Sequence, residues 1–169
     1  FVKKMNKCFP HVKERYFFDN AIRRFSSATN QKNKTDELVD FVIALESLLV
    51  PEKISGTTAR LSHRTATIGG KTDNDMLKIL EFIPIVYDLR SGVVHGDSDR
   101  PLKIDGKTME LKTASQKMEN LTRTIIKKMM IFSQTKENLD NNQGAILKKI
   151  DQMVYKRQYL ERFRKITAP

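Results

Sequence analysis

The sequence predicts an all-α protein, an antiparallel bundle of five to six helices. Apolar residues recur at spacings of three and four in several segments, as one buried face of a helix requires. The seven glycines and five prolines fall mostly between these segments, and no alternating stretch is long enough for a convincing strand. The 169 residues, 39% of them hydrophobic, suit a single domain over 1–169.

The predicted helices are separated by polar or glycine-rich breaks. Residues 30–35 form a polar break, and Pro51 ends the second helix because proline lacks the amide hydrogen that a helix interior needs. Gly69 and Gly70 form a good C-terminal stop for the third helix. The expected helices cover about 12–29, from a cap at Thr35 or Asp36 to Pro51, 52–68, 74–94, 111–132 and 146–160.

The helix expected over 74–94 has few polar positions, and Thr72 or Asp73 can cap its start. Apolar side chains on most of its sides predict burial between other helices or at a subunit interface. Pro84 removes one backbone hydrogen bond, so we expect a kink there or the start of a separate segment. Residues 97–108 are expected to form a polar loop.

Cysteine content and the lack of long apolar runs indicate the cellular compartment of the protein. Cys8 is the only cysteine, so the chain can form neither an intrachain disulfide nor a cysteine metal cage. No run approaches the roughly 20 apolar residues of a membrane span, and the basic start lacks the apolar centre of a signal peptide. We expect a cytoplasmic protein with no membrane partner and no cofactor. Its start at Phe1 rather than Met indicates that it could be a fragment of a longer protein.

The net charge of +11 points to an anionic partner, of which RNA or DNA is the commonest. Residues 1–34 carry a charge of +7, residues 35–108 carry −3 and residues 109–169 carry +7. If the catalytic residues lie in the acidic middle of the sequence, basic helices from the two ends would have to fold around the substrate. The alternative is that these charges are only solvated helix faces.

The segment YDLRSGVVHGD, at the end of the helix expected over 74–94, carries the residues best suited to chemistry. Arg90 offers forked donors to phosphate oxygens, and His95 can exchange protons near neutral pH. Five residues turn an ideal helix through roughly 140°, so the two side chains share a face only if the backbone at Gly92 and Gly96 helps. With Gly96 in a left-handed cap position, His95 would lie at the carboxyl end of the helix, where partial negative charge favours imidazolium.

This pair suits metal-independent RNA cleavage, in which the 2′-hydroxyl attacks the adjacent phosphorus. Histidine would transfer protons, and arginine would bind the charged phosphoryl oxygens of the transition state. Asp88, Asp97 and Asp99 lie nearby but lack the density of a two-metal carboxylate site, so we assign no metal. Taken alone, an arginine followed five residues later by a histidine is more typical of a structural ion pair or a helix cap.

Three segments in order resemble the Apea-like branch of the HEPN superfamily. They are FVIALESLL at 41–49, RLSHRTATIGG at 60–70 and YDLRSGVVHG at 87–96. The likeness covers about 12–135, with 140–166 as an additional basic C-terminal helix. The positions that match the family pattern are Glu46, Arg64, Ala66, Arg90, Ser91, His95 and Gly96. Although Ser91 fits the pattern, many nuclease members have Asn, Asp or His at this position, and Gly69-Gly70 replaces the leucines usual at the end of the third helix.

The resemblance implies a bundle of four or five helices and, in many members, an endoribonuclease of toxin, antiviral or RNA-processing systems. Active members bring the Arg and His motifs of two protomers together in a dimer cleft, and cleavage leaves a cyclic phosphate and a 5′-hydroxyl. The resemblance therefore implies a homodimer that binds and cuts RNA, with Arg90 and His95 as its catalytic residues.

Four further residues are expected to support the site: Glu46, Arg64, Tyr87 and Ser91. Arg64 would either bind phosphate or form a buried salt bridge with Glu46. Tyr87, one turn before Arg90, would reach the site or belong to the core. Two other functions remain open. One is a non-catalytic module that binds RNA, a nucleotide or a partner domain, and the other is a toxin silenced by a cognate nucleotidyltransferase antitoxin that modifies Tyr87 or Ser98.

Overall fold

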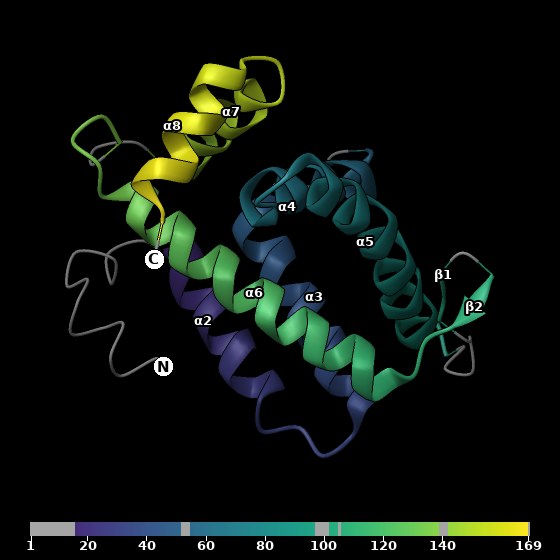
Figure 1. Cartoon of the computed structure of the whole chain (residues 1–169). Coiled ribbons are helices and arrows are strands. Elements are labelled where there is room, and N and C mark those ends of the chain that lie inside the picture. Colours follow the sequence, from purple (N-terminus) through teal and green to yellow (C-terminus); the bar gives the residue numbers. More distant parts are fainter. Residues whose placement is uncertain (1–15, 52–54, 97–101, 105, 139–141, 169) are drawn as a thin grey trace.

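The computed structural model describes residues 16–51, 55–96, 102–104, 106–138 and 142–168. These residues form a helical bundle (Figure 1), which confirms the predicted all-α fold class. None of the described helices is both long enough and apolar enough to span a lipid bilayer. In chain order the elements are α2 (Tyr16–Ala28), α3 (Lys34–Leu49), α4 (Thr57–Gly69), α5 (Asp73–Val94), β1 (Lys103–Ile104), β2 (Lys107–Thr108), α6 (Leu111–Ser133), α7 (Gln143–Met153) and α8 (Arg157–Ile166).

Helix α3 lies at the centre of the bundle and packs against α2, α4, α5 and α6. Its side chains Leu38, Phe41 and Leu45 are completely buried. Phe41 lies beside Phe25 of α2, with the ring centroids 5.5 Å apart. Burial of apolar surface on several sides of α3 therefore supplies much of the stability of the bundle, at about 25 cal/mol for each Å² removed from water.

Helix α5 begins and ends where its capping residues predict. Thr72 and Asp75 form a capping box, in which each backbone amide donates to the other side chain at 3.1 Å. The helix then continues through Pro84 to Val94, so the alternative of a separate segment starting at Pro84 is wrong. The predicted stop of α4 is confirmed, with Gly70 as its C-cap.

The starts of α3 and α4 differ from the prediction. Asn33 caps α3 instead of Thr35 or Asp36, because its side chain accepts a hydrogen bond from the Thr35 amide at 2.8 Å. Helix α4 begins at Thr57, later than expected. Gly56, the residue before the helix, has a φ of +80°. This left-handed conformation is not helical, so the helix cannot begin before Thr57.

The C-terminal part also differs from the prediction, because the single last helix is in fact two helices, α7 and α8. No glycine or proline marks the turn at 154–156 between them. Phe163 of α8 packs edge-on against Phe132 of α6, with the ring centroids 5.1 Å apart, and both side chains are buried. Tertiary burial of Phe163 therefore accounts for the fold-back of α8.

The segment expected to be a polar loop also differs from the prediction, because it contains a small antiparallel pair of strands, β1 with β2.

Gly70 permits a close approach between the end of α4 and the start of α5. A Cβ atom at this position would lie 2.4 Å from Met76 Cγ and 2.9 Å from the Ala66 carbonyl oxygen. We expect Gly70→Ala to lower the free energy of unfolding by about 1–3 kcal/mol, because the added Cβ overpacks this contact. Urea denaturation measures the change. The control is Gly144→Ala, whose Cβ would meet only Asn142 Oδ1 at 3.6 Å. This control should be neutral or stabilising by up to about 1 kcal/mol; equal midpoints for the two variants would contradict the packing argument.

Candidate active site at the end of helix α5

The carboxyl end of α5 is closed by Gly96. The His95 amide donates to the carbonyl oxygens of Ser91 at 3.1 Å and Gly92 at 3.0 Å. Gly96 has a φ of +83°, which confirms the predicted left-handed conformation. His95 is therefore the C-cap residue of α5, and its side chain is exposed to solvent.

Arg90 lies against the interior of the bundle. Its Nη2 is 3.3 Å from Oε2 of Glu46 on α3, and the two side chains are only 27% and 17% exposed. The guanidinium carbon lies 5.8 Å from the centroid of the Tyr87 ring, within the range of a cation–π contact. Arg90 Nε is buried and has no acceptor within the part of the chain that the structure describes. The ion pair with Glu46 thus leaves one guanidinium donor without an internal partner.

Tyr87 also interacts with Glu46. Burial raises the pKa of the Tyr87 phenol above its usual value, the charge of Glu46 and a hydrogen bond to it raise that pKa further, and Arg90 lowers it. The phenol therefore remains a neutral hydroxyl near Glu46. Two of the predicted supporting residues, Glu46 and Tyr87, lie beside Arg90 and can position its side chain.

The Arg90 and His95 side chains do not interact within one protomer. Neither a hydrogen bond nor an ion pair joins them among the described residues. Helix α5 remains regular through Gly92, which is buried, and the left-handed conformation comes only at Gly96, after His95. That the two glycines bring both side chains onto one face stays a prediction. Five helical positions still separate them by roughly 140°.

Arg64 lies away from this group and has a structural partner. Its Nε and Nη2 donate to the Asp151 carboxylate of α7 at 2.8 and 2.7 Å, and Nη1 donates to the Leu49 carbonyl oxygen. The expected salt bridge with Glu46 is wrong, because Asp151 and the end of α3 occupy the guanidinium of Arg64 while Glu46 pairs with Arg90. Asp151 is 87 residues from Arg64 in the sequence, so no local pattern indicated this pair.

The structure gives fewer contacts for the other residues that the sequence analysis named. Ser91 is half-buried in the last turn of α5. Three others, Asp97, Ser98 and Asp99, lie outside the described residues. Within the described ranges, no group of three or more His, Cys, Asp or Glu side chains is placed to hold a metal ion.

The basic helices α7 and α8 lie at the opposite end of α5 from His95 (Figure 1). Arg157 of α8 approaches Asp73 at 3.6 Å, and Arg164 Nη2 lies 3.2 Å from Met76 Sδ, both at the start of α5. With 22 residues, α5 is about 33 Å long. The expectation that basic helices of the same chain surround the Arg90 and His95 segment is therefore wrong for α7 and α8.

Removal of the Glu46 carboxylate tests the contribution of the Arg90 pair to stability. We expect Glu46→Gln to lower the free energy of unfolding by about 1–3 kcal/mol, because it removes the charged partner of a largely buried guanidinium. Urea denaturation measures the change. The matched control is Glu161→Gln, whose pair with Arg157 at 3.4 Å is mostly exposed and should contribute less than about 0.5 kcal/mol. A Glu46→Gln midpoint no lower than that of the control would show that the buried pair does not stabilise the fold.

Comparison with known proteins identifies no relative of this chain. No protein-family model, no curated protein and no solved structure matches it. An interpretation of the Arg90 and His95 segment therefore depends on the chemistry and geometry of its own residues.

Proposed function

We propose that this chain is a metal-independent endoribonuclease of the HEPN type that acts as a homodimer. The observation that carries the proposal is an exposed His95 at a helix end, less than two turns from an Arg90 that Glu46 and Tyr87 hold in place. A proton-transferring histidine and a phosphate-binding arginine are the two groups that this reaction needs. The net charge of +11 suits an RNA substrate. From the family resemblance we infer a role in a cytoplasmic toxin or antiviral defence system.

In the proposed reaction, His95 accepts the proton of a 2′-hydroxyl, whose oxygen attacks the adjacent phosphorus. The bond from phosphorus to the 5′-oxygen breaks, and the leaving oxygen takes up a proton from water. The products are a 2′,3′-cyclic phosphate and a 5′-hydroxyl. Arg90 binds the non-bridging oxygens as negative charge builds up in the transition state, and Glu46 and Tyr87 position it.

A dimer is part of the proposal because the family resemblance implies a shared site, and because neither a hydrogen bond nor an ion pair joins Arg90 to His95 among the described residues of one protomer. Val94, the neighbour of His95, is 59% exposed, so a large apolar side chain lies directly beside the histidine. A second copy that covered Val94 would bury apolar surface. In the proposed dimer, the same contact would bring Arg90 of the second copy toward His95 of the first.

The first test is RNA cleavage in the presence of EDTA. Wild-type protein should cut RNA to products with 2′,3′-cyclic phosphate ends, and His95→Ala should lower the rate by about 100-fold or more, as loss of a general acid–base does. His63→Ala is the matched control, because His63 is also exposed but lies on α4. Equal thermal unfolding of both variants excludes misfolding. Undiminished cutting by His95→Ala would overturn the assignment.

The second test asks whether two protomers share the site. Arg90→Ala and His95→Ala should each be inactive, yet their mixture should recover about a quarter of wild-type activity, since half of the dimers would be mixed and would hold one intact site. Cleavage assays of the mixture, after exchange of protomers, measure this recovery. A mixture as inactive as its components would show that no site is built from Arg90 of one protomer and His95 of the other.

A non-catalytic RNA-binding module is the second candidate, favoured by the ion pair that already occupies Arg90. In that case the pair of Arg90 and Glu46 only stabilises the fold, and His95 takes no part in a reaction. Salt-sensitive RNA binding by wild type and His95→Ala alike, without cleavage products, would favour this module.

A further inference from the structure

A pocket of about 380 Å³ lies between the end of α6 and the helices α7 and α8. Its floor is apolar, with Phe132, Met153 and Phe163 almost completely buried. The volume falls within the range of about 300–1,000 Å³ that is typical of small-ligand sites. This pocket shares no lining residue with the Arg90 and His95 segment, so it is a candidate site of its own.

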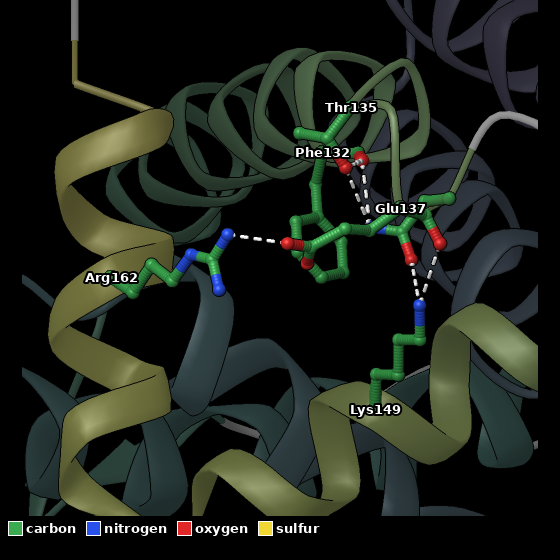
Figure 2. Close-up of polar contacts among 6 residues, drawn as sticks. Phe132, Thr135, Glu137, Lys149 and Arg162 are labelled. Carbon is green, nitrogen blue, oxygen red and sulfur yellow. Dashed lines mark hydrogen bonds and ion pairs between the residues drawn. The ribbon is translucent and has the colours of Figure 1, made fainter.

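The rim of the pocket carries more positive than negative charge. Three cationic side chains line it, Lys136, Lys149 and Arg162, beside the carboxylate of Glu137. Figure 2 shows Arg162 and Lys149 extending from α8 and α7 toward the Glu137 segment. Arg162 Nη2 pairs with Glu137 Oε1 at 2.5 Å, but both side chains are more than half exposed, so a second anion can compete for this arginine. Residues 143–166 contain seven basic and two acidic residues, and this surplus favours an anionic ligand.

Lys149 is held in position by the turn after α6 (Figure 2). Its Nζ donates to the Glu137 carbonyl oxygen at 2.8 Å and to Asn138 Oδ1 at 2.5 Å. Asn138 is buried, and its amide donates to the Phe132 carbonyl oxygen at 3.0 Å and to Thr135 Oγ1 at 2.9 Å. The third donor of the ammonium has no acceptor among the described residues. The cation is thus preorganised, which lowers the entropic cost of binding a ligand.

An aromatic ring stands at the edge of the same pocket. Tyr159 lines it and is 40% exposed, and Lys156 Nζ lies 5.2 Å from the centroid of its ring. Exposed aromatic rings beside cations are typical of surfaces on which the bases of a single strand stack. Tyr155, on the turn between α7 and α8, is 88% exposed but does not line the pocket.

We propose that this pocket binds one nucleotide of single-stranded RNA, with the base against Tyr159 and the apolar floor and the phosphate at Lys149 and Arg162. The choice of RNA rests on the proposed function, whereas the binding of a base with its phosphate rests on the pocket alone. A purely apolar ligand would leave the cations of the rim unused. A duplex cannot insert a base, because its bases are paired and stacked. The site would anchor RNA at the end of α5 that is distant from His95.

The test is binding of a fluorescent single-stranded 2′-O-methyl RNA, which has no free 2′-hydroxyl and cannot be cleaved by the proposed reaction. Fluorescence anisotropy gives the Kd at several salt concentrations. Tyr159→Ala should weaken binding at least about fivefold, as loss of a stacked base does. Arg162→Gln should weaken binding and reduce the slope of log Kd against log salt by about 0.7, the loss of one phosphate contact to a single strand.

Two matched controls distinguish the pocket from the rest of the basic surface. Tyr155→Ala removes a more exposed tyrosine, and Arg157→Gln removes a cation of the same helix that pairs with Asp73 and Glu161. Neither control should change the Kd by more than about twofold, because neither residue lines the pocket. Equal effects of Tyr159→Ala and Tyr155→Ala would overturn the pocket as the site.

Competition by small probes tests the chemical class of the ligand. AMP should displace the labelled strand at lower concentration than adenosine or inorganic phosphate, since the pocket is proposed to bind base and phosphate together. Equal competition by AMP and inorganic phosphate, or by polyglutamate and unlabelled RNA, would overturn the nucleotide assignment. Nucleotide-dependent binding without any RNA cleavage would sustain this inference while the proposed catalytic function fails, so the two are separable.

Discussion

The guanidinium of Arg64 is the contact on which the arrangement of the C-terminal half depends. It joins α4 to the Asp151 carboxylate of α7 through two hydrogen bonds, and it donates to the Leu49 carbonyl oxygen at the end of α3. Gln143, the first residue of α7, donates to the carbonyl oxygens of Ser47 and Leu48 at 2.9 and 3.0 Å. The last carbonyls of a helix have no partner within it, so α7 satisfies groups that α3 leaves open. The position of α7 follows from this junction, and the packing of Phe163 against Phe132 then places α8 beside the pocket.

The same junction leaves Glu46 available for the candidate active site. Because Asp151 and the end of α3 occupy Arg64, the carboxylate of Glu46 on α3 can pair with Arg90 of α5 and lie beside Tyr87. Arg64 and Arg90 therefore have different roles. One organises the scaffold, and the other is held near a helix end where phosphate chemistry is proposed.

The distribution of positive charge acquires a different meaning in three dimensions. In the sequence, an acidic middle between basic ends suggested that the ends wrap around the Arg90 and His95 segment. In the fold, α7 and α8 lie beside the start of α5, about 33 Å along that helix from His95. A strand of RNA that reached both regions would have to run along the bundle or bridge two protomers.

The sequence by itself determined the helical fold class and the limits of α5, because apolar periodicity, the Thr72 cap and the left-handed Gly96 act over a few residues. It also placed Tyr87 one turn before Arg90 on one helix, with His95 at the end of that helix. Only the tertiary structure decided the pairing of Arg64 with Asp151, the fold-back of α8 and the pocket beneath it. These features join side chains far apart in the chain, and their energy comes from burial and hydrogen bonds that no local pattern encodes.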